Sequence, residues 1–200
     1  MSHPSYLGHY DASRDTPQET VIVQVDKDNI ITRLSSGWDQ AAADGQAADS
    51  LAQNKVIGLP LRHFITSDTT RMYVESCLKL CRLRQQVLYR PYRCDSPTHK
   101  RFLELQLTPL AEQAVEMKHF LLKEEPFERP VSIEDITNAE ITPAGTYVRC
   151  SFCNRLKSMK NEHWTLPEQV ALQPSQALRV IHSVCPDCKD AMWHKRTQAI

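Results

Sequence analysis

Two Cys-x-x-Cys pairs constrain the fold of this chain more than any other feature. Cys150 and Cys153 form the first pair and Cys185 and Cys188 the second, with 31 residues between the pairs. Each pair brings two sulfur atoms together from one tight turn, so two such turns complete the four-thiolate shell of a tetrahedral metal ion. We therefore predict a structural zinc site, with iron on the same thiolates or a redox dithiol as alternatives. A closed shell has no open position for a catalytic water.

The remaining composition indicates a reducing environment. The chain has seven cysteines, begins without a basic start followed by an apolar run, and has no apolar stretch of the roughly 18 to 20 residues that a membrane-spanning helix needs. We expect a cytoplasmic protein without membrane contact, in which paired cysteines bind metal rather than form disulfides.

Charge and proline content predict four segments. Residues 1–17 lack hydrophobic periodicity and are expected to form a flexible arm. Residues 125–146 hold five acidic residues, one basic residue and three prolines, which is typical of a linker. The linker would join a domain at 18–124 to a small zinc-stabilised module at 147–200. Apolar residues that could form a minimal core for this module are Trp164, Leu166, Val170, Leu172, Leu178 and Ile181.

Hydrophobic patterning over residues 18–124 predicts an α+β domain. Two β-rich runs joined by a polar turn indicate a hairpin, and three further strand-like runs come later; the five runs are 20–25, 30–34, 86–94, 101–108 and 115–122. Between the second and third runs, Asp68 can cap a helix whose apolar stripe is Val74, Cys77, Leu78 and Cys81. This order is typical of an antiparallel five-stranded sheet with helices on one face, with Cys77 and Cys81 in the core.

The same region resembles a PAS sensory domain. The matching residues are Val21-Ile-Val-Gln-Val-Asp26, Asn29-Ile-Ile-Thr, Trp38 and Val56-Ile-Gly58-Leu-Pro60-Leu-Arg-His-Phe64-Ile, within about residues 20–124. The resemblance departs at Leu34-Ser35, where many members carry Asn. It implies a cleft between sheet and helices that holds a flavin, a haem or a small metabolite, or is filled by side chains.

The residues near this implied cleft disfavour two of these cofactors. The flavin photosensor branch has a cysteine where this chain has Leu61-Arg-His-Phe-Ile-Thr-Ser-Asp68, and haem-binding members use a histidine from the long helix, which has none here. His63 precedes the helix and is left as a candidate ligand. Arg93, in a basic and aromatic stretch, is a candidate for binding an anion at the cleft mouth, with a solvated hairpin as the alternative.

The tail carries a second resemblance. Cys150-Ser-Phe-Cys153-Asn-Arg155, Trp164 and His182-Ser-Val-Cys185-Pro-Asp-Cys188 are similar to a four-cysteine module that follows sensory domains in bacterial signalling proteins. Together the two resemblances imply a signalling or regulatory protein that acts through a protein partner or a homodimer and can take a small-molecule ligand.

The alternatives are a transcription regulator that contacts DNA through the zinc module, or an enzyme. Residues 147–200 hold eight basic and four acidic residues, and four thiolates around Zn²⁺ add −2, which leaves a small excess of about +2 for binding phosphate. The whole chain has a net charge of zero. No Gly-rich phosphate loop, Gly-x-Ser-x-Gly elbow or His-Glu-x-x-His run occurs, so we expect no enzymatic activity.

Overall fold

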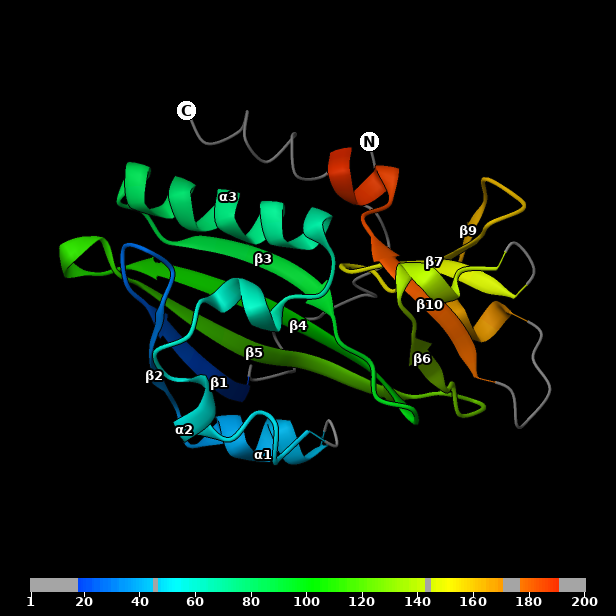
Figure 1. Ribbon diagram of the computed structural model, residues 1–200, viewed down its shortest axis with the longest axis horizontal. Coiled ribbons are helices and arrows are strands. Elements are labelled where there is room, and N and C mark those ends of the chain that lie inside the picture. Colours follow the sequence, from blue (N-terminus) through cyan, green and yellow to red (C-terminus); the bar gives the residue numbers. More distant parts are fainter. Residues whose placement is uncertain (1–17, 45–46, 143–144, 171–176, 191–200) are drawn as a thin grey trace. The chain divides into compact units, whose positions relative to one another are not determined.

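The computed structural model describes residues 18–44, 47–142, 145–170 and 177–190 (Figure 1). The chain divides into two compact units that interleave along the sequence. We call the described residues of Asp11–Pro91 and Leu103–Lys123 the sheet unit, and those of Tyr92–Phe102 and Glu124–Ile200 the cysteine unit. The arm expected at residues 1–17 lies outside the described residues. No helix in the described ranges has both the length and the apolar character needed to cross a bilayer.

The first five strands form one sheet, in the order β2-β1-β5-β4-β3. The elements along the chain are β1 (Gln18–Val25), β2 (Ile31–Leu34), α1 (Gly37–Asp44), α2 (Gln53–Val56), the 3-10 helix η2 (Leu61–Phe64), α3 (Asp68–Arg84), β3 (Leu88–Arg93), β4 (His99–Pro109), the 3-10 helix η3 (Ala111–Gln113) and β5 (Val115–Pro126). Strand β1 pairs antiparallel with both β2 and β5. The predicted α+β class and order of elements are confirmed. The division between the two units falls within β3, β4 and β5.

Alternating side chains give this sheet one buried face. The residues buried at every second position are Val21, Val23 and Val25 on β1, Leu103, Leu105 and Leu107 on β4, and Val115 and Met117 on β5. The residues between them are largely polar and partly exposed: Gln24 Nε2, for example, donates a 2.8 Å hydrogen bond to Glu116 Oε2. The pattern is that of a sheet covered on one side.

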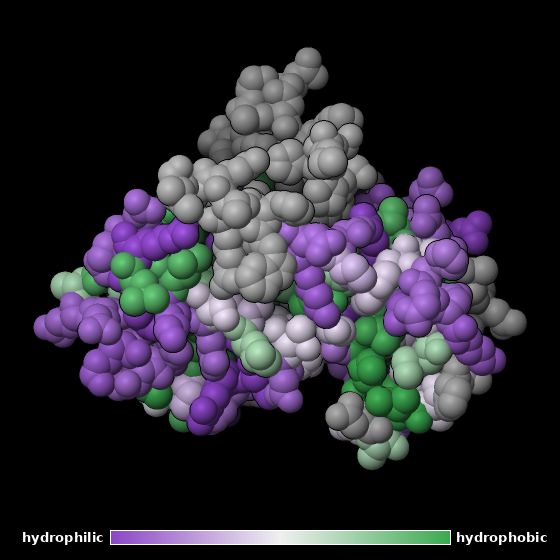
Figure 2. All heavy atoms as spheres, turned by 90° about the horizontal axis from the view of Figure 1, so that it is seen from above, coloured by the Kyte–Doolittle hydropathy of each residue, from purple (hydrophilic) through white to green (hydrophobic). Residues whose placement is uncertain are grey.

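Helix α3 covers much of the buried face of this sheet. Three residues of the predicted stripe, Cys77, Leu78 and Cys81, are buried, and the fourth, Val74, is partly exposed. Tyr73, which was not predicted, is also buried. Cys81 Sγ lies 3.6 Å from the carbonyl oxygen of Leu107, and burial raises the pKa of its thiol. Both helix cysteines are therefore core residues, whereas Met72 and Leu83 on the opposite side of α3 are exposed. The face shown in Figure 2 is mostly hydrophilic where it is coloured, with hydrophobic residues in small groups.

One local contact differs from the sequence prediction, and another lies where the PAS resemblance departs. Ser67, not Asp68, caps α3: its hydroxyl accepts the Thr70 N–H at 3.3 Å, and Asp68 is the first helical residue. Ser35, at the departure from the PAS pattern, is well paired, since its hydroxyl accepts the Ile22 N–H at 2.9 Å.

The cysteine unit has its own sheet, in the order β6-β10-β7-β8-β9. Its elements are β6 (Ile133–Asp135), the 3-10 helix η4 (Asn138–Glu140), β7 (Thr146–Cys150), β8 (Leu156–Ser158), β9 (Trp164–Thr165), the 3-10 helix η5 (Pro167–Gln169) and β10 (Leu178–Ser183). Strand β10 runs parallel to both β6 and β7, whereas β8 is antiparallel to β7 and β9.

The segment expected as a linker is part of this unit, so the structure differs from the predicted boundaries. Residues 125–146 contribute β6, which pairs with β10, and the buried side chains of Phe127 and Val131. These two pack with Leu156, Leu178 and Val180. Of the core residues predicted from the sequence, Leu178 is buried and Leu172 lies outside the described residues. The others are partly buried: Trp164, Leu166, Val170 and Ile181. The acidic, proline-rich composition favoured a linker because the apolar residues of this segment are isolated in sequence. In the structure Phe127 and Val131 pack into the core of the cysteine unit.

A histidine on β5 gives the sheet unit a predicted pH response. His119 pairs in register with Val21, and burial lowers its pKa from 6.5 to about 4. An unfolded chain takes up this proton near pH 6.5, whereas the folded chain does so only near pH 4, so stability falls as the pH decreases between these values. We expect the free energy of unfolding to drop by about 2 kcal/mol between pH 7 and pH 5 from this group alone.

Urea unfolding at both pH values, compared between the native protein and His119→Gln, isolates this contribution because any metal loss affects both chains equally. Equal pH dependence in the two proteins would contradict the assignment.

Candidate metal centre

The first cysteine pair lies in the turn between β7 and β8. Cys150 ends β7, and its N–H donates to Arg155 O at 2.8 Å, while Asn154 N–H donates to Cys150 O at 3.0 Å. Asn154 adopts a left-handed conformation with φ of 59°, which asparagine tolerates better than most residues. These bonds close a tight turn that presents both sulfurs on one side.

The second pair joins the end of β10 to a helical segment at residues 186–190. Pro186 occupies the first helical position, where its missing N–H leaves no intrahelical bond unmade. Cys185 O accepts the Lys189 N–H at 3.0 Å, and Cys188 lies one turn further along the helix. Parallel pairing of β10 with β7, with Ser183 opposite Cys150, brings the two cysteine turns to the same end of the sheet.

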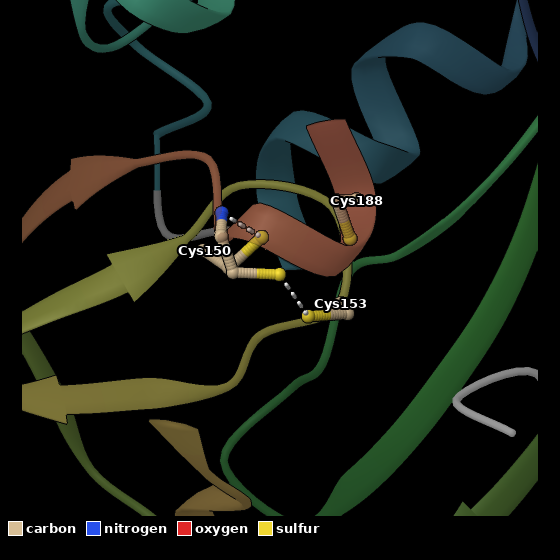
Figure 3. Close-up of side chains that lie close together, drawn as sticks. Cys150, Cys153 and Cys188 are labelled. Carbon is tan, nitrogen blue, oxygen red and sulfur yellow. Dashed lines mark hydrogen bonds between the residues drawn. The ribbon is translucent and has the colours of Figure 1, made fainter. Parts of the chain in front are cut away.

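All four sulfur atoms converge (Figure 3). They lie within 4.8 Å of one another, and the four residues are 0–3% exposed. Cys153 Sγ and Cys185 Sγ are 3.7 Å apart, and all four thiols are free of disulfides. Two sulfurs bound at about 2.3 Å to one tetrahedral ion would be about 3.8 Å apart. The cluster therefore has the dimensions of a four-cysteine metal site.

Electrostatics make a cation necessary for full deprotonation. Hydrogen bonding to Cys153 and the other cysteines lowers the pKa of Cys150, whereas hydrogen bonding to Cys150 raises the pKa of Cys188. Four buried thiolates this close together would repel one another strongly. A divalent cation at their centre offsets this repulsion and lets all four act as ligands. The Cys185 N–H adds one further stabilising donor, 3.4 Å from Cys150 Sγ.

An ion pair joins the two cysteine turns around the cluster. Arg155 Nη1 lies within bonding distance of Asp187 Oδ2, and the Arg155 side chain is largely buried. Arg155 follows the first pair by two residues, and Asp187 lies between the two cysteines of the second pair. Val184, Phe152 and Trp164 pack against the sulfurs and complete an apolar surround.

The tip of the β3–β4 hairpin also binds the first cysteine turn. Arg93 N–H donates a 2.7 Å hydrogen bond to Phe152 O, inside the Cys150–Cys153 turn. The Arg93 side chain is 2% exposed and forms a two-point pair with Asp95, at 3.1 and 2.6 Å, above the ring of Phe102. Because its guanidinium is already neutralised, an anionic ligand at Arg93 would have to compete with Asp95.

The other candidate residues are not members of the sulfur cluster. His63 is exposed on η2, in the sheet unit. His182, from the tail motif, forms a 2.8 Å hydrogen bond with Asp135 through Nε2, which lowers the pKa of that carboxyl group.

Sequence reasoning assigned no role to Asp95, Arg155 or Asp187, although the last two lie within the motif of the tail. Arg155 and Asp187 could have been found from their opposite charges beside the two cysteine pairs, whereas the partner of Arg93 has no local signal.

A comparison with protein-family models finds no matching family. Neither the curated proteins nor the solved structures give a match. The functional argument therefore rests on the geometry of the chain itself.

Loss of the ion pair around the cluster should loosen metal binding. In Asp187→Ala the two cysteine turns lose their side-chain link, and we expect metal transfer to a chelator to be roughly three- to tenfold faster than in the native protein. Glu162→Ala is the matched control, since it removes a carboxylate that pairs with Lys157 at 3.1 Å in the same unit. Identical transfer rates for the two variants would show that the Arg155–Asp187 pair has no part in holding the metal.

Proposed function

We propose that this chain is a signalling or regulatory protein in which a PAS-like sensor unit is coupled to a structural zinc centre, without a catalytic output of its own. The observation that carries the proposal is the convergence of four buried cysteine sulfurs from two turns. A closed four-thiolate shell suits a structural role because it leaves no coordination position for water or substrate. The expected setting is a reducing compartment such as the cytoplasm.

Zinc fits the site better than the alternatives. A redox dithiol needs an accessible sulfur of lowered pKa, whereas the four residues here are at most 3% exposed. Iron can occupy the same four thiolates, and the metal's colour distinguishes it from zinc. Zinc also suits the small strands of the cysteine unit, where metal binding supplies much of the folding free energy.

Two features support the sensor part of the proposal. The sheet unit has two strands, short helices, one long helix and three more strands, which is the order that the PAS resemblance implies. The Arg93–Phe152 hydrogen bond then joins the tip of β3 and β4 to a cysteine turn. Because β3 and β4 are divided between the two units, we expect a metal bound at the cysteines to restrain the parts of these strands that lie in the cysteine unit.

Support for the DNA-binding alternative is weaker. Three basic side chains of the zinc module already have acidic neighbours: Arg155 has Asp187, Lys157 has Glu162, and Arg179 has Glu134. Paired basic groups release fewer counterions from DNA and so contribute little to binding. We therefore favour a protein partner or a second copy as the route of output.

Metal content tests the zinc assignment. Native mass spectrometry should find one zinc per chain, and replacement by Co²⁺ should give the intense visible bands of a four-thiolate tetrahedral site. Cys185→Ser should lose the metal and unfold the cysteine unit, because it breaks the closed shell. Full metal retention in Cys185→Ser, or a visible band in the untreated protein, would contradict structural zinc.

Amide exchange tests the coupling. Removal of metal with a chelator should release the turn at Phe152, so the Arg93 amide should exchange at least about tenfold faster. Amides in the middle of α3, which is in the sheet unit, serve as the internal control and should keep their protection. Undiminished protection of Arg93 in the metal-free protein would separate the hairpin from the metal centre, even if zinc binding itself is correct.

A further inference from the structure

A second stripe runs along α3, opposite the buried one. Met72, Ser76, Lys79 and Leu83 recur every three or four residues, and all four are exposed. Met72 is 68% exposed and Leu83 is 73% exposed, the highest values among the exposed large hydrophobic residues of the described chain. Single exposed apolar residues are common, but two of this exposure aligned on one helix mark an interaction surface.

At the centre of the stripe, a small side chain permits a second helix to approach α3 closely. Ser76 lies there, and its hydroxyl donates a 2.7 Å hydrogen bond back to Met72 O. The serine is thus satisfied within its own helix and presents a small surface to a neighbour. Another helix can therefore cross α3 at short range at this point.

Two charges beside the stripe have no partner within the described chain. Glu75 and Lys79 are both exposed, and neither forms an ion pair or hydrogen bond with another described residue. Three other charges of α3 do have partners: Arg71 pairs with Asp68 at 2.8 Å, and Arg82 donates to Asn29 at 2.8 Å. The exposed side of α3 therefore carries one acidic and one basic side chain, Glu75 and Lys79, that have no partner among the described residues.

These residues are arranged symmetrically about the middle of the helix. The midpoint between Met72 and Leu83 is also the midpoint between Ser76 and Lys79, and the midpoint of Glu75 and Lys79 is half a residue away. If a second α3 packs antiparallel across this point, Met72 meets Leu83 of the other copy and Glu75 meets its Lys79. Each contact then occurs twice, as a two-fold interface requires. Antiparallel packing also aligns the helix dipoles favourably.

We propose that α3 is the interface of a homodimer, in which the helices of two copies pack antiparallel through Met72, Ser76, Lys79 and Leu83 with reciprocal Glu75–Lys79 ion pairs. The occupant is a second copy of this chain because the free charges are of both signs and complement themselves. A helix of this length is about 25 Å long, so two such helices bury less than the roughly 1,600 Å² of a standard stable interface. The dimer is therefore weak and reversible.

Sedimentation velocity of the full chain from about 5 to 300 µM tests the proposal. The native protein should shift from monomer to dimer as concentration rises, more so at low salt than at high salt. Leu83→Asp should weaken dimerisation at least about tenfold, since it places a charge in the apolar contact. Arg33→Glu, an exposed charge change on β2, is the matched control and should leave the equilibrium unchanged.

Charge reversal identifies the pairing itself. Glu75→Lys and Lys79→Glu should each weaken self-association, because like charges then face each other across the two-fold axis. The double variant restores opposite charges and should recover most of the native association. A mixture of the two single variants should form a heterodimer more readily than either variant forms a homodimer.

Circular dichroism melting checks that each variant remains folded. A monomer at every concentration overturns the proposal. So does a dimer that is insensitive to Leu83→Asp, because its interface must then lie elsewhere. Failure of the double variant to recover association rejects the antiparallel register. None of these outcomes depends on whether the cysteines bind zinc.

Discussion

Repulsion among four closely spaced thiolates is the constraint on which the cysteine unit depends. The sulfurs lie within 4.8 Å of one another in a buried site, so the native arrangement with all four deprotonated is favourable only around a cation. The surrounding structure is slight: β9 has two residues, and β6 and β8 have three each. Strands of this length bury little surface, so a metal bound to the four cysteines would supply much of the folding free energy of this unit.

Backbone hydrogen bonds connect the cysteine turns to residues that lie far from the cysteines in sequence. Phe127 N–H donates to Thr98 O at 2.9 Å and Val131 N–H to Pro97 O at 2.8 Å, so the stretch after β5 closes over the β3–β4 hairpin. The hairpin in turn binds Phe152 through Arg93. Burying the Arg93–Asp95 pair carries a desolvation cost, which a two-point geometry and the Phe102 ring partly offset. Such a pair favours one arrangement of the hairpin over alternatives that would leave either charge unpaired.

Features with a local signal were predictable from sequence, and features made by distant partners were not. The five strands, α3 and the four cysteines each follow from spacing along the chain. The role of residues 125–146 does not, because Phe127, Val131 and Ile133 are isolated in acidic sequence and β6 pairs in parallel with a strand more than forty residues away. The Ser67 cap was missed for a different reason: its φ of 70° is unusual for serine, so the local pattern favoured Asp68. Asp95 and Phe152, the partners of Arg93, depend on tertiary contacts alone.

Helix α3 has a buried side that covers the sheet and an exposed side with apolar residues. The net charge of the chain affects how the exposed side could meet a second copy. A helix needed only to cover a sheet would have a polar outer side, whereas α3 carries Met72 and Leu83 there. The net charge of the chain is zero, so two copies approach without long-range repulsion. Short-range complementarity then decides whether they associate, and at α3 it depends on Glu75 and Lys79. Salt screens these exposed charges but not the apolar contacts beside them, so the two contributions to association differ in their dependence on ionic strength.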